Sequence, residues 1–385
     1  MSIKDAIKGA VSYIIQNGCP VNQGKACFLI TQYHHNNCLV LLSYLLKATD
    51  MGFVLLTDKA SYDSYTARYA QETRVKVIDK ERDKLAAYRE MMSSRYVFFM
   101  HFNPYGGFVR KNKQTIINLW HGAGYKANNG EQIVFDKVLV PGPAFVEPKA
   151  AFFECDPQKI LPLGYPRYDL FRGNSIRAQG LREKLAGKKN KLIIWAPTYR
   201  DKFSGNGNTE KASECNYDLP LLNSNNDLDK LDELCKASGV SILIKRHPYQ
   251  DKYEGEETQR TNIVFMDGKN FSEAGIDLYE FLPFTDALIS DYSSIAVDYM
   301  LLNKPIAFAL DDFTEYEAKR GFVFRNPLDY MPGHHLYNKE DLEHFVLEVA
   351  ESKDRYQPNR QNLLLQMHNP CQNYCARIWE TIRDV

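Results

Sequence analysis

The chain has 385 residues, of which 44% are hydrophobic and 25% are charged, a balance typical of a soluble globular protein with a substantial core. At the usual domain size of about 100–200 residues, this length predicts two domains. The 48 basic and 48 acidic residues cancel, which excludes a general basic field that would attract nucleic acid or a membrane.

Residues 3–16 predict an amphipathic helix, with isoleucine and valine side chains on one stripe and polar side chains opposite. The charges of Lys4, Asp5 and Lys8 interrupt the apolar core that a signal peptide needs. We expect this helix to pack on its own domain. The alternative is an interfacial helix that rests on anionic lipid.

Strands and helices then alternate along the first half of the chain. A helix is predicted over residues 39–46, and helical patterns precede the third and fourth strands. The predicted strands cover 26–31, 53–57, 75–78, 96–100, 116–120, 134–140 and 159–163. This rhythm predicts a parallel, doubly wound sheet.

A polar stretch with three glycines, residues 172–190, predicts the linker between two domains. A second series follows, with strands over 192–196, 241–245, 263–266, 287–289 and 305–310, and helices over 228–237, 278–282, 295–303, 339–352 and 373–382. Residues 201–219, rich in Ser, Asn and Gly, predict a mobile loop.

We therefore expect an α/β protein with domains at residues 1–175 and 190–365. A C-terminal helix within 366–385 would pack back on the first domain. Two similar doubly wound domains in tandem would face each other across a central cleft. Ligands of such sheets bind outside the carboxyl ends of the strands, so the site residues are expected there.

A histidine follows the predicted strand 116–120 directly. His121 at a strand end is well placed to act as a general base, and a structural histidine is the alternative. Gly122 allows the backbone to turn tightly and a substrate to approach. No bulky side chain follows His121, but the local pattern alone does not distinguish the two interpretations.

Donor side chains follow other predicted strands. Arg167 lies in a turn after a strand and is expected to point into the region of His121, although a plain interdomain turn is the alternative. Pro197 removes a backbone N–H at the end of the strand 192–196. The neighbouring Thr198 and Arg200 offer hydrogen-bond donors for a phosphate.

Three donor or cationic side chains, Lys245, Arg246 and His247, come directly after the predicted strand 241–245. A buried strand that ends in this way indicates a bound anion. A solvated basic turn is the alternative. No Walker-type phosphate loop and no G-x-G-x-x-G motif occur.

Asp291, Ser293 and Ser294 supply turn and N-cap residues between a predicted strand and a predicted helix. The free N–H groups and the positive dipole end of such a helix suit a phosphate. An ordinary N-cap is the alternative. Together with Arg246 and His247, these residues predict a diphosphate pocket.

Five motifs in order resemble the CDP-glycerol glycerophosphotransferases, which build teichoic acids and related poly(polyol phosphate) polymers. The resemblance covers roughly residues 95–330 and rests on W-H-G at 120–122, G-Y-P-R at 164–167, A-P-T-Y-R-D at 196–201, R-H-P at 246–248 and S-D-Y-S-S at 290–294. It implies a GT-B fold of two Rossmann-like domains. The C-terminal domain would hold mainly the nucleotide and the N-terminal domain the acceptor.

The resemblance also implies an activity. Members transfer glycerol phosphate from CDP-glycerol to a hydroxyl of a membrane-anchored acceptor and release CMP, generally as peripheral proteins on the inner membrane face. His121 would be the base, and Arg246 with His247 would bind and stabilise the pyrophosphate. Ser293 and Ser294 would hold phosphate at the helix N-terminus.

Two departures from the family pattern stand out. Tyr199 replaces a Trp that many relatives carry, and the loop 123–126 lacks the Thr-Pro that often follows the His-Gly pair. The second departure leaves the identity of the acceptor open. The chain length favours a primase, short-chain or capsule-type enzyme over one with an extra membrane-targeting domain, and the sequence does not distinguish one transfer from many.

Further expectations concern the reaction and its rivals. No cluster of carboxylates suggests a metal, so we expect neither a metal nor a cofactor, and no nucleic acid partner. No apolar run approaches the ~18 residues of a membrane span, so the protein is expected in the cytoplasm or on the inner membrane face. The alternatives are a GT-B transferase that uses CDP-ribitol or a nucleotide sugar, and a non-catalytic nucleotide-binding scaffold.

Overall fold

A computed structural model describes residues 18–31, 36–101, 113–127, 133–198, 219–245 and 260–384. The chain divides into two compact units. Unit 1 comprises Met1–His121, Gly130–Asp169 and Cys371–Val385, and unit 2 comprises Gly122–Asn129 and Leu170–Pro370. Compared with the expected ranges 1–175 and 190–365, a short segment directly after His121 belongs to unit 2.

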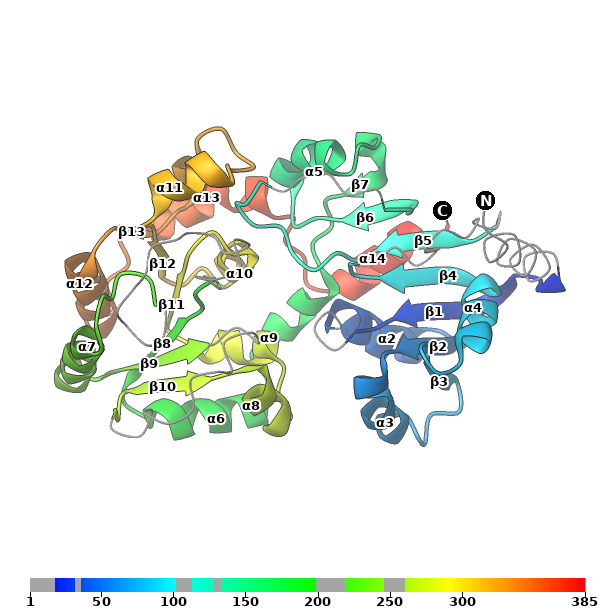
Figure 1. Ribbon diagram of the computed structural model, residues 1–385, viewed down its shortest axis with the longest axis horizontal. Coiled ribbons are helices and arrows are strands. Elements are labelled where there is room, and N and C mark those ends of the chain that lie inside the picture. Colours follow the sequence, from blue (N-terminus) through cyan, green and yellow to red (C-terminus); the bar gives the residue numbers. More distant parts are fainter. Residues whose placement is uncertain are drawn as a thin grey trace. The chain divides into compact units, whose positions relative to one another are not determined.

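Unit 1 is built on one parallel sheet in the order β3-β2-β1-β4-β5-β6-β7 (Figure 1). Its strands are β1 (Asn22–Leu29), β2 (Gly52–Thr57), β3 (Val75–Asp79), β4 (Ser94–Phe99), β5 (Thr115–Asn118), β6 (Lys137–Leu139) and β7 (Ile160–Leu161). Its helices are α2 (Asn36–Ala48), α3 (Lys59–Arg68), α4 (Lys84–Met92), α5 (Val146–Phe152) and α14 (Tyr374–Ile382), with 3₁₀ turns η1 (Pro143–Phe145) and η2 (Pro157–Lys159). The strand order reverses between β1 and β4, which makes this pair the switch point of the sheet.

Unit 2 contains a second parallel sheet in the order β10-β9-β8-β11-β12-β13. Its strands are β8 (Lys191–Trp195), β9 (Val240–Lys245), β10 (Ile263–Met266), β11 (Ala287–Ser290), β12 (Ile306–Ala309) and β13 (His334–Leu336). Here the switch point lies between β8 and β11. The two sheets confirm the predicted pair of doubly wound α/β domains.

The helices of unit 2 are α6 (Ile176–Ala186), α7 (Asn225–Ser238), α8 (Gly268–Glu273), α9 (Leu278–Phe281), α10 (Ser294–Tyr299), α11 (Phe313–Lys319), α12 (Lys339–Ala350) and α13 (Gln357–Met367). Its 3₁₀ turns are η6 (Leu282–Phe284), η7 (Met300–Leu302) and η8 (Pro327–Tyr330), and η3 (Pro166–Arg172) runs across the division between the units. Helix α10 is short and continues directly into η7.

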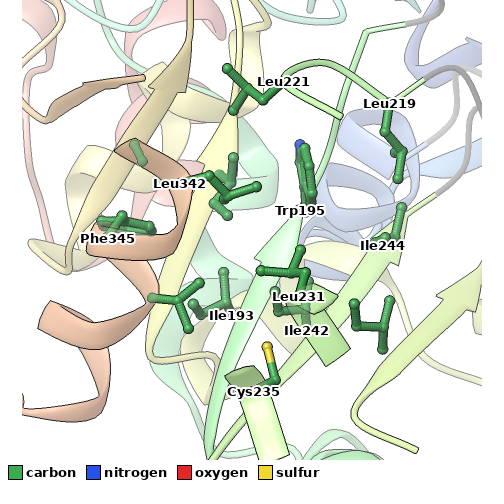
Figure 2. Close-up of a cluster of buried hydrophobic side chains, with 14 of the residues drawn as sticks. Ile193, Trp195, Leu219, Leu221, Leu231, Cys235, Ile242, Ile244, Leu342 and Phe345 are labelled. Atoms are coloured by element: carbon green, nitrogen blue, oxygen red, sulfur yellow. The ribbon is translucent and has the colours of Figure 1, made fainter. Parts of the chain in front are cut away.

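A cluster of buried hydrophobic side chains covers one face of the unit 2 sheet. Ile193 and Trp195 of β8 point to the same side because successive strand residues alternate. Figure 2 shows Leu231 of α7 and Phe345 of α12 packed over this face. Burying each such side chain stabilises the fold by about 1.5–3 kcal/mol, and this face fixes the strands whose ends carry the candidate site.

The predicted linker over residues 172–190 is wrong, because it contains helix α6. The hydroxyl of Ser175 accepts a hydrogen bond from the N–H of Ala178 at 3.3 Å, and Gly187, with φ +64°, ends the helix. Ala178 and Ala186 are the buried side chains of this helix. Because small residues make the packing face, the segment lacks the apolar period that marks most helices.

The C-terminal helix α14 belongs to unit 1. The carboxylate of Asp169 accepts hydrogen bonds from the N–H groups of Tyr374 and Cys375, at 2.8 and 3.0 Å, and so satisfies the first turn of α14. The helix also packs against α2. The last segment of the chain thus completes the unit with which the chain begins.

Two sequence predictions lie largely outside the described residues. The amphipathic helix predicted over 3–16 lies wholly outside them. Of the loop predicted over 201–219, only Leu219 is described. None of the helices in the described ranges is long and apolar enough to cross a membrane. Within the same ranges, no group of three or more His, Cys, Asp or Glu side chains is arranged to hold a metal ion.

Candidate active site

His121 follows β5 through an unusual turn. The N–H of Trp120 donates to the side-chain oxygen of Asn118 at 2.8 Å, and Trp120 has φ +50°, in the left-handed region. A bulky residue in this conformation costs about 1–3 kcal/mol and persists only where its surroundings hold it. His121 therefore follows a turn and not a continuation of β5, and the left-handed conformation of Trp120 lowers the stability of the fold.

Asn37 in the first turn of α2 holds this turn in place. Its side-chain amide donates to the carbonyl oxygens of Leu119, at 3.3 Å, and Trp120, at 2.7 Å. Its side-chain oxygen accepts a hydrogen bond from the N–H of Arg167 at 3.2 Å, and the residue is fully buried. Asn37 was not among the predicted site residues, although an Asn pair at the start of a helix is a visible signal.

Arg167 lies beside His121, so the structure brings together two predicted site residues. The guanidinium Nη1 of Arg167 donates to the carbonyl oxygen of His121 at 2.7 Å, and Arg167 is only 2% exposed. The same guanidinium lies over the ring of Tyr165, 4.7 Å from its centroid. This contact directs Arg167 at the backbone of His121.

Aromatic side chains surround the imidazole of His121. The ring of His101, two residues beyond β4, lies 4.8 Å from the ring of His121 at an angle of 77°, and the ring of Trp120 lies 4.4 Å away. The ammonium of Lys149 sits over the Trp120 ring, 4.6 Å from its centroid. His101 was not among the predicted site residues, because nothing in the local pattern pairs it with the end of β5.

In unit 2, Thr198 and Asp291 meet at the switch point between β8 and β11. The N–H of Thr198 donates to one carboxylate oxygen of Asp291 at 2.7 Å, and its hydroxyl donates to the other. Asp291 is 2% exposed. The preceding Pro197 is buried and has no N–H to satisfy. These hydrogen bonds between two predicted site residues thus link the end of β8 to the end of β11.

The turn after Asp291 leads into α10 and carries two serine hydroxyls. Ser293 is the N-cap, and neither its hydroxyl nor that of Ser294 forms a hydrogen bond within the described part of the chain. Gly124 packs against this turn: a Cβ there would lie 2.9 Å from the backbone nitrogen of Ser294 and 2.9 Å from the carbonyl oxygen of Tyr292. Gly122, just before this contact, has φ +150°. Gly124 is therefore needed for the close packing of this loop on the turn before α10, and Gly122 adopts a positive φ that glycine favours.

Lys126 reaches the same strand ends. Its ammonium donates to the hydroxyl of Thr198 at 3.3 Å. Burial lowers the pKa of Lys126, and the negative charge of Asp291 acts in the opposite direction. Lys126, two residues after Gly124, was not among the predicted site residues.

Lys245 ends β9, opposite Met266 in the parallel register. Burial lowers the pKa of Lys245, and the charge of Asp267 opposes this shift. The remaining donors of the predicted diphosphate pocket, Arg246, His247 and Arg200, lie outside the described residues. Their part in the pocket stays a prediction.

Curated relatives come from teichoic acid synthesis. The teichoic acid ribitol-phosphate primase of Bacillus spizizenii is 28% identical over 274 residues, which is 65% of this chain and 63% of the relative. The teichoic acid glycerol-phosphate primase of Bacillus subtilis is 24% identical over 273 residues, 66% of this chain and 65% of the relative. The chain spans less than two thirds of the length of each relative.

Solved structures agree in fold. The wall teichoic acid polymerase TagF aligns with a TM-score of 0.74 and 19% identity, over 99% of this chain and 95% of that chain. A UDP-GlcNAc 2-epimerase of Methanocaldococcus jannaschii aligns with a TM-score of 0.58 and 11% identity, over 94% and 100%. These similarities confirm the predicted GT-B type of fold.

A family model matches residues 11–376 and therefore nearly the whole chain. Its description is CDP-Glycerol:Poly(glycerophosphate) glycerophosphotransferase. The match includes all the strand ends described above. The chain therefore belongs to the CDP-glycerol:poly(glycerophosphate) glycerophosphotransferase family.

Proposed function

We propose that this protein transfers glycerol phosphate from CDP-glycerol to a hydroxyl of a lipid-linked or polymer acceptor and releases CMP. The product would be a teichoic-acid or capsule-type polymer of the cell surface. The family match over residues 11–376 is the observation that carries the proposal. A TagF variant soaked with CDPG supports the choice of donor.

The proposed reaction is one displacement at phosphorus. The acceptor hydroxyl attacks the β-phosphorus of CDP-glycerol, a new P–O bond forms, and the bond to the CMP oxygen breaks. His121 takes the proton of the hydroxyl as general base. The turn that carries His121 is held by Arg167 and Asn37, which supports this role because a base must be positioned within hydrogen-bond reach of its proton.

Unit 2 would bind the donor. The hydroxyls of Ser293 and Ser294, which bond to no other group in the described ranges, are available as donors to phosphate. We assign Arg246 and His247 to the pyrophosphate, where they would stabilise the negative charge that grows on departing CMP. Preorganised donors of this kind supply most of the catalysis in phosphoryl transfer. The strand-end residues Pro197, Thr198, Arg200 and Lys245 would complete the donor site, and Gly122 would give the acceptor access to His121.

The domains would divide the substrates between them. We assign the acceptor to the N-terminal domain at 1–175 and the nucleotide to the C-terminal domain at 190–365. Because the proposed acceptor is lipid-linked, the protein would work at the inner face of the cell membrane. Binding to vesicles that contain anionic lipid, compared with neutral vesicles, tests this placement.

A second candidate differs only in the donor. Relatives from Bacillus spizizenii and Staphylococcus aureus, 26–28% identical to this chain, are named as ribitol-phosphate primase or polymerases. CDP-ribitol carries the same pyrophosphate, so the same strand ends could hold it. The phosphate-binding residues therefore do not distinguish glycerol from ribitol.

The experiment is a donor panel. We expect CMP release from CDP-glycerol only when an acceptor ending in glycerol phosphate is present. Release only from CDP-ribitol would keep the mechanism and change the substrate. Binding of CDP-glycerol without CMP release under any acceptor condition would contradict the proposed activity and favour a scaffold.

A further inference from the structure

We infer that Lys126 is a further donor-binding residue, whose ammonium contacts a non-bridging oxygen of the donor pyrophosphate. The inference rests on the proposed function and extends it to a residue outside the five motifs. It depends on the hydrogen bonds, charges and backbone support around Lys126 in unit 2.

The ammonium of Lys126 has more hydrogen-bond donors than the single bond it forms to Thr198. A lysine ammonium has three N–H groups. Within the described residues, the 3.3 Å contact with the hydroxyl of Thr198 is the single hydrogen bond of Lys126. Lys126 as a whole is only partly buried. Two N–H groups are therefore available to an anion.

Asp291 places a negative charge close to Lys126. Both carboxylate oxygens of Asp291 are occupied by Thr198. The Asp291 charge nevertheless remains at the strand end, where it would repel a phosphate. The ammonium of Lys126 contacts the Thr198 hydroxyl and forms no direct ion pair with Asp291 in the part of the chain that the structure describes. The ammonium of Lys126 can therefore offset the negative charge of Asp291 and still contact a ligand.

Backbone contacts hold the segment around Lys126 in place. The carbonyl oxygen of Tyr125 accepts a hydrogen bond from the N–H of Val323 at 2.8 Å, and the N–H of Ala127 donates to the carbonyl oxygen of Gly321 at 3.2 Å. Lys126 itself pairs with Phe322 in an antiparallel bridge. Both backbone neighbours of Lys126 are thus fixed, which limits the freedom that the side chain loses on binding.

Gly124 then links this segment to the proposed phosphate site. Its Cα faces the backbone nitrogen of Ser294 so closely that no Cβ fits between them. Lys126, two residues further along, is therefore presented beside the turn that carries the two serine hydroxyls.

The alternative is that Lys126 merely neutralises Asp291 and supports the fold. Binding of donor fragments separates the two roles. A phosphate contact affects CDP-glycerol and CDP but leaves cytidine untouched, because cytidine has no phosphate. A structural role affects all three ligands together with thermal stability.

The experiment measures the affinities of CDP-glycerol and CDP by calorimetry and of cytidine by ligand-observed NMR. For Lys126→Met we expect CDP-glycerol and CDP to bind about 10–100-fold more weakly, the effect of a lost charge-assisted hydrogen bond, and cytidine to bind unchanged. Lys126→Arg should recover part of the loss. Lys319→Met is the matched control, because Lys319 is an exposed lysine of unit 2 that pairs with Glu315.

Two outcomes overturn the inference. One is unchanged CDP-glycerol affinity in Lys126→Met, and the other is an equal loss for cytidine. If Lys126→Met does not fold, Lys126→Gln takes its place, with the same expected ratios. Failure of the wild-type protein to bind CDP-glycerol would instead contradict the proposed function, so the two failures are distinguishable.

Discussion

Thr198 and Asp291 are joined by two hydrogen bonds across the switch point of the unit 2 sheet, one from the backbone N–H and one from the hydroxyl of Thr198. The bonds connect the residues that follow β8 and β11. Asp291 was predicted to bind substrate. Its oxygens are already engaged, so we expect it to position Thr198 for the donor.

This pair makes a first prediction. Asp291→Asn replaces an acceptor with an amide donor that faces the Thr198 N–H or hydroxyl, which should destabilise unit 2 by about 1–3 kcal/mol. Thr198→Val removes the hydroxyl from the same contact. A double-mutant cycle in urea unfolding should show a coupling of at least about 0.5 kcal/mol, and additive effects would mean that the contact does not form.

Gly124 gives a second prediction. In Gly124→Ala the new Cβ meets backbone atoms of the Tyr292–Ser294 turn at 2.9 Å, and backbone cannot move as cheaply as a side chain. We expect a loss of about 1–3 kcal/mol in unfolding free energy and weaker CDP-glycerol binding.

Gly180→Ala is the matched control for this change. Gly180 lies in α6, and a Cβ added there would have no atom within 4 Å. Alanine in a helix interior is favoured over glycine by about 0.8–1.0 kcal/mol, so this variant should be stabilised. Equal effects of the two substitutions would contradict the close approach of Gly124 to α10.

Asn37 gives a third prediction, for catalysis. Asn37→Ala removes the donor to the Leu119 and Trp120 carbonyls and the acceptor of the Arg167 N–H. We expect kcat to fall at least about 10-fold, because misplacement of a catalytic group is costly, while KM changes little. Steady-state kinetics checks the split; a change in KM alone would show that Asn37 does not position His121.

Stability should depend on pH through His368, whose Nε2 contacts the carbonyl oxygen of Val297 at 2.8 Å. Burial lowers the pKa of His368 from 6.5 to about 4. The unfolded state therefore binds a proton more readily than the folded state. The contribution to stability is fully present above pH 6.5 and is lost as the pH falls toward 4.

His334 should add to this effect, because burial lowers its pKa, while the charge of the nearby Glu348 carboxylate acts in the opposite direction. Each group changes the unfolding free energy by at most about 1.4 kcal/mol per pH unit in this window. Urea unfolding at pH 7, 6 and 5 measures the slope. His368→Phe should have a shallower slope than the wild type, and identical slopes would contradict the buried neutral histidine.

The sequence predicted β1 to β12 because most of their apolar runs are buried on both faces of parallel sheets, as in β9 and β11. It missed β13, a three-residue strand that contains two histidines. It also placed His121, Thr198 and Asp291 at strand ends, where topology brings site residues together. Helix α6 escaped recognition because alanines form its packing face.

The missing parts of the site depend on tertiary contacts. Asn37 meets residues more than 80 positions away in the chain, and Lys126 meets Thr198 across 72 positions. The left-handed conformation of Trp120 is likewise imposed by its partners and not by its own preference. The residues next to Asn37, Trp120 and Lys126 in the sequence do not indicate such long-range contacts.

The most direct test of the account compares single-turnover CMP release from CDP-glycerol in the wild-type protein and in His121→Ala, with acceptor present. We predict that the substitution lowers the rate about 10²–10⁴-fold, the range for a lost general base, while CDP-glycerol affinity and thermal stability stay near those of the wild type. Near-normal CMP release by His121→Ala would contradict the assignment of His121 and the mechanism built on it.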